Sequence, residues 1–143
     1  MSEITTLFPE ENSPIVHVDV LIIGAGISGI GAAHHLTEKC PGKSYAILES
    51  KAAYGGTWRQ HTYPGIRSDS DLYTFGYGFK PWTGKPIASA DAILDYMGEA
   101  IEEGQIDQYI HYNHQVLSAS WSSAEQRWTV EARQKDVGTK RHT

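Results

Sequence analysis

The fold of this chain is decided by the stretch Val18-Asp-Val-Leu-Ile-Ile-Gly24-Ala-Gly26-Ile-Ser-Gly29-Ile-Gly-Ala-Ala-His-His-Leu36. Its apolar beginning, residues 18–23, predicts a buried parallel strand, and the helical spacing of apolar residues over 27–39 predicts a helix. Between them, Gly24 suits a tight turn, Gly26 lets a backbone approach a pyrophosphate, and Gly29 lets the helix pack closely on the strand. The helix N-terminus would offer free N–H groups and a partial positive charge to phosphates.

A second apolar stretch, residues 44–49, completes a strand–helix–strand unit and ends in an acid, Glu49. This acid lies about 20 residues beyond Gly29, where a dinucleotide fingerprint places the acceptor for a ribose 2′-hydroxyl. A carboxylate there repels a 2′-phosphate, so the site suits the AMP half of FAD or NAD better than NADP, although Lys51 is nearby. The alternative is a crossover unit whose glycines only ease the turn and whose Glu49 is a solvated strand end. The combination of elements favours a dinucleotide site.

Composition and charge narrow the class of protein. The chain has 143 residues, of which 40% are hydrophobic and 20% charged, and this fits one modest globular domain. Its net charge is −5, its pI is near 5.7 and its basic residues are scattered, so we expect no nucleic-acid partner. No apolar run reaches membrane-spanning length, and the single cysteine, Cys40, excludes an internal disulfide, so a cytoplasmic location is expected. The seven histidines are not at metal-ligand spacing, so no metal site is expected.

The chain divides into segments of different character. Residues 1–16 are expected to be loosely ordered, residues 17–134 to form the domain, and residues 135–143 to be a polar tail. Glycine, proline and aromatic residues dominate residues 50–86. A long connection of this kind inside a compact domain is usually functional or disordered, and its aromatic content argues against disorder.

Hydrophobic patterns predict the remaining elements. We predict a helix from Ser89 to Gly104, a short strand over residues 109–116, and a hairpin made of residues 116–121 and 127–132. The expected fold is therefore α/β, a parallel sheet with a covering layer of helices and a small antiparallel hairpin.

Two motifs in the middle of the chain carry a family resemblance. The first is Gly55-Gly56-Thr57-Trp58, and the second is Tyr63-Pro-Gly-Ile-Arg67-Ser68-Asp69-Ser-Asp-Leu-Tyr73. With these motifs in order, the chain from Asp19 to about Val130 resembles the N-terminal part of the class B flavoprotein monooxygenases, of the Baeyer–Villiger type. Within that family it is similar to the actinobacterial group that activates ethionamide. The resemblance implies a Rossmann-like, FAD/NAD(P)-binding three-layer fold.

The resemblance also implies roles for individual residues. It assigns Gly24, Gly26, Ser28 and Gly29 to the FAD pyrophosphate, Glu49 to the adenosine ribose, and Gly56, Thr57, Trp58, Arg59 and Gln60 to the loop that leads toward the flavin. Asp69 corresponds to the family's aspartate near the isoalloxazine and the nicotinamide, and is the candidate catalytic residue; Arg67 and Ser68 adjoin it at positions associated with NADP, and the backbone of Val116 would meet the adenine. Other interpretations stay open: the glycine pairs as turns, the aromatics Trp58, Tyr63 and Tyr73 as core residues, and Asp69 as a helix cap or turn acid.

The function that the resemblance implies is an oxygenation dependent on FAD, NADPH and O₂. In that family a peroxyflavin oxygenates a ketone or a soft atom such as sulfur. Family members run to several hundred residues and carry a second Gly-x-Gly-x-x-Gly for NADP, whereas this sequence has one. We therefore expect the N-terminal part of the FAD-binding domain, C-terminally incomplete, with an open sheet edge, inactive alone and dependent on the rest of the enzyme or a partner chain. A non-catalytic flavin- or adenylate-binding module and a fragment of an NAD-type dehydrogenase are the alternatives.

Overall fold

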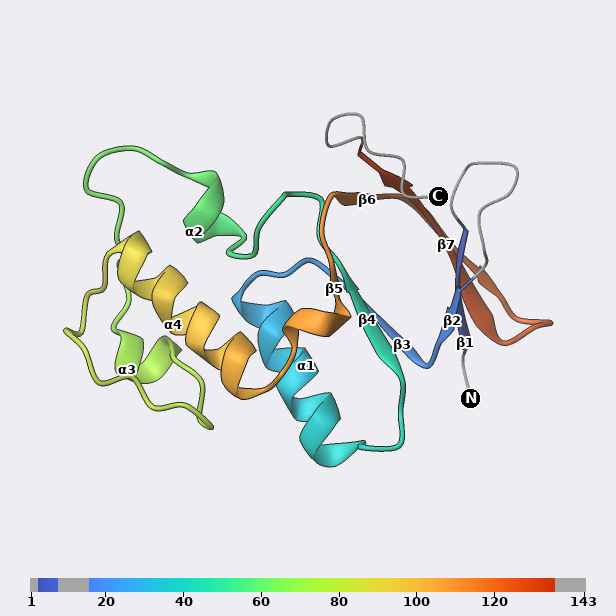
Figure 1. The fold of residues 1–143 in the computed structure, drawn as a ribbon, viewed down its shortest axis with the longest axis horizontal. Coiled ribbons are helices and arrows are strands. Elements are labelled where there is room, and N and C mark those ends of the chain that lie inside the picture. Colours follow the sequence, from blue (N-terminus) through green and yellow to red (C-terminus); the bar gives the residue numbers. More distant parts are fainter. Residues whose placement is uncertain (1–2, 8–15, 136–143) are drawn as a thin grey trace.

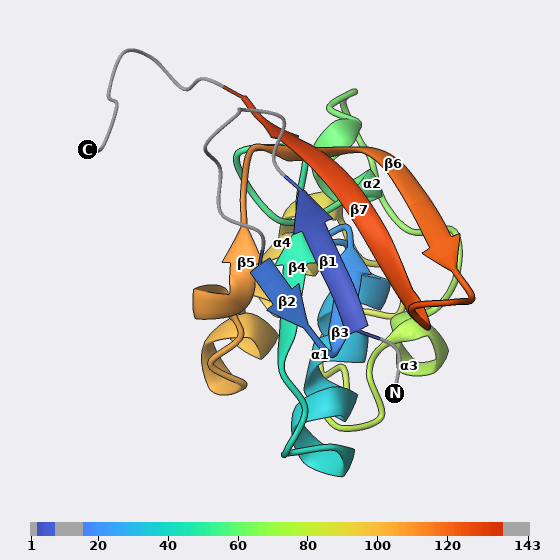
Figure 2. The same cartoon turned by 90° about the vertical axis from the view of Figure 1, so that its right-hand side faces the viewer.

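The computed structural model describes residues 3–7 and 16–135, and their elements lie in three layers (Figure 1). Helices α1 (Ile27–Lys39) and α4 (Ala90–Glu103) cover one face of a three-stranded parallel sheet. A four-stranded sheet lies on the other side of the parallel sheet (Figure 2). The predicted architecture of a parallel sheet, a helix layer and an antiparallel hairpin is confirmed. None of the helices in the described ranges is long and apolar enough to cross a membrane.

The parallel sheet has the order β3-β4-β5, formed by β3 (Val20–Ile23), β4 (Tyr45–Leu48) and β5 (Ile110–His111). All residues of the central strand β4 are buried, as its continuous apolar sequence predicts. Strand β3 pairs with β4 along one edge, and no strand of the described residues pairs with its other edge. The side chain of Ile23, at the end of β3, is 61% exposed. Strand β5 forms the other edge of this sheet, so both β3 and β5 have one edge with which no strand of the described residues pairs.

The predicted strand over residues 18–23 is divided at Asp19. The Asp19 carboxylate accepts hydrogen bonds from the backbone N–H and the hydroxyl of Ser44, at 2.8 and 3.1 Å, and these bonds lower the pKa of Asp19. The chain before Asp19 forms β2 (Val16–Val18), which joins the four-stranded sheet, while the chain after it forms β3. The apolar residues on both sides of Asp19 do not reveal this change of sheet, because they fit a strand in either sheet.

Helices α1 and α4 begin and end where the sequence predicts. The Ser89 hydroxyl caps α4 by accepting a hydrogen bond from the Ala92 N–H at 3.2 Å. The apolar stripe of α4 faces the core, where fully buried side chains from α1, β4 and α4 include Ile30, Ile47, Ile93 and Met97. Burial of each such side chain contributes about 1.5–3 kcal/mol to folding, so this layer carries much of the stability.

The four-stranded sheet has the order β2-β1-β7-β6, with β1 (Glu3–Leu7), β6 (His114–Ser122) and β7 (Arg127–Gln134). Strands β6 and β7 form the predicted antiparallel hairpin, and β1 pairs parallel to β7. The strand predicted over residues 109–116 is divided, because Asn113 has a φ of 59° and separates β5 from β6.

The structure differs from the expectation of a loosely ordered tail over residues 1–16. Residues 3–7 form β1, which gives the backbone groups along the edge of β7 a hydrogen-bonding partner. Residues 8–15 lie outside the described residues. The predicted polar tail lies outside them too, apart from residue 135.

The long connection over residues 50–86 is irregular apart from two short helices, α2 (Thr57–Gln60) and α3 (Leu72–Phe75). Aromatic hydroxyl groups fasten it to the helix layer. The Tyr77 hydroxyl donates to the Ile27 carbonyl at 2.5 Å, and the Tyr96 hydroxyl of α4 donates to the Lys80 carbonyl and accepts from the Tyr77 N–H. The prediction that this segment is ordered is therefore confirmed.

Candidate dinucleotide-binding site

The glycine loop lies between the end of β3 and the beginning of α1. Gly24 has a φ of +101°, a conformation that favours glycine, and it begins the turn. A Cβ added at Gly29 would overlap the Gly24 carbonyl oxygen, so the close packing of helix on strand requires glycine there. Gly26 is free of such a clash: an added Cβ would lie 3.7 Å from the Cα of Gly56. The structure thus requires glycine at positions 24 and 29, as the sequence predicts, whereas the role of Gly26 beside a pyrophosphate stays a prediction.

The first turn of α1 suits an anion. Gly26 is its N-cap residue, no side chain caps the helix, and its first turn contains no acidic residue. The free N–H groups and the helix dipole therefore favour a phosphate at this end. Ser28 lies exposed on the same turn.

Glu49 follows β4 and lies beside the glycine loop. Its side chain is buried, with 6% exposure. One carboxylate oxygen, Oε1, accepts from the Ala25 N–H at 3.3 Å, and the other, Oε2, accepts from the Lys51 N–H at 3.2 Å. The backbone of Glu49 continues the ladder toward β5 through its N–H, which donates to the His111 carbonyl. This arrangement excludes the alternative of a solvated strand end.

The Gly55-Gly56-Thr57-Trp58 motif packs directly against the glycine loop. The Gly55 N–H donates to the Ala25 carbonyl at 3.0 Å, and a Cβ on Gly56 would lie 3.1 Å from the Cα of Gly26. Gly56 has a φ of +56° and begins α2, so the paired glycines serve both the turn and the close approach. Two segments far apart in the sequence thus meet at the position predicted for a pyrophosphate.

The residues of α2 face in different directions. Thr57 and Gln60 are exposed, and Trp58 packs partly buried against the core. Arg59 turns back onto the protein: its Nε donates to the Tyr54 carbonyl at 2.8 Å, and its guanidinium lies 5.3 Å from the centre of the Tyr54 ring. The arginine therefore has a structural contact that the sequence did not reveal.

The Arg67-Ser68-Asp69 sequence runs beside the residues that precede α4. Ser68 is buried; its N–H donates to the Ala88 carbonyl at 2.9 Å and its Oγ accepts from the Ala88 N–H at 3.1 Å. Arg67 and Asp69 line an open hollow of about 660 Å³ together with Tyr63. Asp69 is not a helix cap.

The aspartate that caps α3 is Asp71, which accepts from the N–H groups of Tyr73 and Thr74. Tyr63 and Tyr73 are 59% and 60% exposed, so neither is a core residue.

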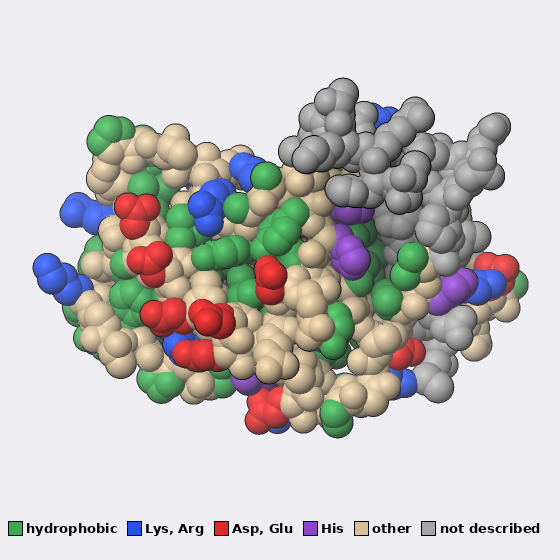
Figure 3. Space-filling model, in the orientation of Figure 1, with side chains coloured by type: hydrophobic (Ala, Val, Ile, Leu, Met, Phe, Trp, Pro, Cys, Tyr) green, Lys and Arg blue, Asp and Glu red, His purple; other side chains and the backbone are tan. Residues whose placement is uncertain are grey.

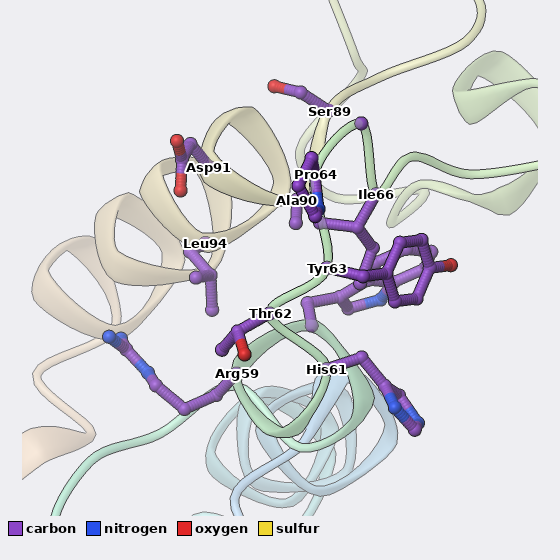
Figure 4. A pocket seen from close by; sticks show the side chains of 12 residues that line it. Arg59, His61, Thr62, Tyr63, Pro64, Ile66, Ser89, Ala90, Asp91 and Leu94 are labelled. Atoms are coloured by element: carbon purple, nitrogen blue, oxygen red, sulfur yellow. The ribbon is translucent and has the colours of Figure 1, made fainter.

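A second hollow, of about 480 Å³, lies between α2, the Tyr63–Ile66 turn and the first half of α4 (Figure 4). It shares Tyr63 and Gly65 with the hollow beside Asp69, so the two are neighbours. Its polar lining includes His61 and Asp91, which the sequence did not single out as site residues. No motif marks them, because loop and helix come together only in the fold.

The adenine position predicted for Val116 lies on β6. The neighbouring His114 N–H donates to the Glu49 carbonyl at 2.8 Å, which links the start of β6 to the end of β4. Val116 is partly buried. Its contact with adenine stays a prediction.

Titratable groups near Glu49 are perturbed. Burial raises the pKa of Tyr112 to about 12, with smaller contributions from Asp107, Tyr54 and Glu49. Burial, followed by the neighbouring His114, lowers the pKa of His111. The neutral forms of Tyr112 and His111 are therefore favoured in the folded chain.

Acidic side chains gather over α4 (Figure 3), where Asp95, Glu99 and Glu103 are exposed. Lys80 forms ion pairs with Glu99 and Glu103 at 3.2 and 2.9 Å, and the hydrogen bond to Glu103 raises the pKa of Lys80. Phosphates are repelled by this face and attracted by the end of α1. Among the residues that the structure describes, no group of three or more His, Cys, Asp or Glu could hold a metal ion.

A parallel strand, a glycine loop, the N-terminus of a helix and a buried acid at the end of the next strand define an α/β dinucleotide-binding protein. Residues 22–96 match the family model described as an NAD(P)-binding Rossmann-like domain, more than half of the chain, and the chain belongs to this family.

Individual relatives are monooxygenases. The chain is 57% identical over 115 residues to the FAD-containing monooxygenase EthA of Mycolicibacterium smegmatis, covering 80% of this chain and 23% of that protein. It is 44% identical over 128 residues to the probable FAD-binding monooxygenase AlmA of Acinetobacter baylyi, covering 89% and 25%. Among solved structures, an oxidized steroid monooxygenase bound to NADP matches with a TM-score of 0.73 and 28% identity, over 80% of this chain and 23% of that one.

The chain thus spans about a quarter of the length of the relatives it matches. The predicted resemblance to flavoprotein monooxygenases is confirmed by these relatives.

Proposed function

We propose that this chain is the FAD-binding portion of an NADPH- and O₂-dependent flavoprotein monooxygenase. One observation carries the proposal: the buried Glu49 carboxylate and the Gly55-Gly56 turn both contact the loop between β3 and α1. An acceptor for a ribose hydroxyl, a close backbone approach and a free helix N-terminus are what the adenosine and pyrophosphate of FAD require. The names of the monooxygenase relatives include FAD, and one related solved structure is bound to NADP. Both observations support FAD and NADPH as the cofactors.

The residues present fit FAD in order along the cofactor. Glu49 would hold the adenosine ribose and the backbone of Val116 the adenine. Gly24, Gly26, Ser28 and Gly29 would hold the pyrophosphate; Gly56, Thr57 and Trp58 would lead toward the flavin, with Arg59 and Gln60 at the edge. FAD would supply the hydride acceptance from NADPH and the activation of O₂ that no side chain supplies.

The chain's own contribution near the flavin would come from Asp69 and Arg67. Both side chains line the same open hollow, and they carry opposite charges. In our proposal Asp69 is the catalytic residue: its carboxylate would orient the nicotinamide and would favour the positive charge that the ring of NADPH gains when it gives up a hydride. Arg67 offers its guanidinium to phosphate, with Ser68 between them holding the backbone. The proposed substrate is a small ketone or sulfide, and the proposed location of the enzyme is the cytoplasm. The remainder of the enzyme, or a partner chain, would supply the second nucleotide site.

The proposal is tested with the purified 143-residue chain. We expect FAD to bind weakly, measured by quenching of flavin fluorescence. We expect Glu49→Arg to weaken binding by about 1–3 kcal/mol, since the ribose hydroxyl loses its acceptor. Exposed Glu102 is the matched control, because Glu102→Arg makes the same change of charge on α4. Equal FAD affinity of the Glu49→Arg variant and the parent would contradict the assignment.

The same preparation tests catalysis. NADPH oxidation, with or without a sulfide, is expected not to exceed that of free FAD. Hydride transfer needs donor and acceptor atoms about 3–3.5 Å apart, and one glycine loop serves one dinucleotide. Clear turnover would contradict the expectation of dependence on another domain. Binding of NAD in preference to FAD would instead favour a dehydrogenase.

A further inference from the structure

The Glu49 carboxylate contacts the glycine loop itself as well as the place proposed for the ribose. Its Oε1 accepts from the N–H of Ala25, the residue between Gly24 and Gly26, at 3.3 Å. Ala25 is fully buried, so its N–H is shielded from bulk water. The contact spans 24 residues of sequence and joins the end of β4 to the turn after β3.

The Ala25 N–H lies in a gap between two regular hydrogen-bond patterns. The preceding N–H, of Gly24, donates to the Leu48 carbonyl and continues the sheet. The helical pattern starts at the next residue, the N-cap Gly26, whose carbonyl accepts from the Ile30 N–H. The Ala25 N–H therefore depends on a side chain, and Glu49 supplies it.

The Ala25 peptide groups are held from two directions. The Ala25 carbonyl accepts from the Gly55 N–H at 3.0 Å, while the Ala25 N–H donates to the Glu49 carboxylate. Together the two bonds fix the orientation of the backbone on both sides of Ala25, and thereby the direction in which Gly26 faces. Gly26 is the residue at which the backbone must lie open for a pyrophosphate.

Glu49 retains capacity for a ligand while it makes these contacts. Each carboxylate oxygen has two lone-pair directions, and each accepts one backbone N–H, from Ala25 or from Lys51. A ribose hydroxyl can therefore bond to the same group without displacing the loop.

We propose that Glu49 is a positioning residue for the pyrophosphate loop, in addition to accepting a hydrogen bond from the ribose. This inference rests on the proposed dinucleotide function. Its carboxylate holds the Ala25 N–H, and so sets the loop before any ligand binds. Glu49 should then matter for ligands that have a pyrophosphate but no ribose hydroxyl groups.

The first readout needs no ligand. Amide hydrogen exchange of the ligand-free chain, followed by NMR, reports the Ala25 N–H directly. We expect exchange at Ala25 to be about 10-fold faster in Glu49→Ala and intermediate in Glu49→Gln, whose amide oxygen can still accept one N–H. Glu102→Ala removes an exposed carboxylate from α4 and should leave Ala25 unchanged. Unchanged exchange at Ile47 in β4 shows that a variant remains folded, and Glu49→Gln serves if Glu49→Ala does not fold.

The second readout separates the loop from the sugar. ADP and 2′,3′-dideoxy-ADP are titrated into the parent, Glu49→Ala, Glu49→Gln and Glu102→Ala. If Glu49 positions the loop, both ligands lose about 3-fold or more in Glu49→Ala. A loss confined to ADP, or Ala25 exchange equal to that of the parent in folded Glu49 variants, overturns the proposal. Failure of the parent to bind ADP or FAD contradicts the proposed function instead, and the exchange at Ala25 still decides the positioning contact.

Discussion

Gly29→Ala should destabilise this chain through a clash inside the strand–turn–helix unit. An added Cβ would overlap the Gly24 carbonyl oxygen and lie 3.1 Å from the Gly24 carbonyl carbon and 3.4 Å from Cγ2 of Ile22. Two of these atoms belong to the backbone of the turn, so the clash cannot be relieved by a change of rotamer. Helix α1 must move away from β3.

The magnitude follows from two opposing effects. Overpacking a filled interior costs about 1–3 kcal/mol, and we take about 3 kcal/mol because the obstacle is backbone. Alanine gains about 1 kcal/mol over glycine within a helix, and Gly29 belongs to α1. The net loss in the free energy of unfolding is about 2 kcal/mol, which lowers Tm by roughly 6–8 °C for a domain of this size.

The assay is thermal and urea denaturation followed by circular dichroism at the helix band. Gly42→Ala is the matched control: Gly42 follows α1, has an ordinary φ, and a Cβ there would meet nothing within 4 Å. We expect the Gly42→Ala variant to melt with the parent. A Gly29→Ala variant that melts within about 2 °C of the parent would refute the argument that Gly29 is needed for helix–strand packing.

Three further predictions concern binding, packing and pH. Gly26→Ala should keep the Tm of the parent and weaken FAD binding, because the methyl group fits beside Gly56 but occupies space needed by the pyrophosphate; parallel loss of Tm and affinity would make Gly26 purely structural. Tyr77→Phe should lower the free energy of unfolding in urea by about 1 kcal/mol, since the Ile27 carbonyl loses a donor, and an unchanged midpoint would contradict that contribution. The pKa of His111 is lowered in the folded chain, so below pH 6.5 the unfolded chain binds a proton more readily than the folded chain does. The free energy of unfolding should therefore decrease as the pH falls below 6.5. Urea titrations at a series of pH values should show a smaller decrease for His111→Asn.

Local patterns were enough to predict the elements that carry the glycine loop. The boundaries of α1 follow from the glycines before Ile27 and from Pro41-Gly42 after it, and Ser89 marks the beginning of α4. Glu49 could be placed because its distance along the chain from Gly29 is fixed by the strand–helix–strand unit. Short-range geometry determines all of these positions.

Contacts between distant segments could not be predicted from the sequence. The parallel pairing of residues 3–7 with β7 joins parts of the chain more than 100 residues apart, and no local pattern encodes that pairing. The division of an apolar stretch at Asp19 depends on Ser44, which lies 25 residues further along the chain. A side chain that bonds to a distant backbone leaves no periodic signal in the sequence.

Ser68 shows how such a bond can shape the hollow that it helps to line. The chain at residues 66–68 pairs in an extended manner with residues 88–90: the Ser68 N–H donates to the Ala88 carbonyl, and the Ala90 N–H donates to the Ile66 carbonyl. Side chains of extended backbone alternate between faces, and that of Ser68 is buried against Ala88, so its two charged neighbours are directed outward. Arg67 and Asp69 are exposed, and both line the same hollow as Ser68. The buried serine thus helps to direct the side chains of Arg67 and Asp69 outward. A small residue whose hydroxyl accepts from the Ala88 N–H suits this position.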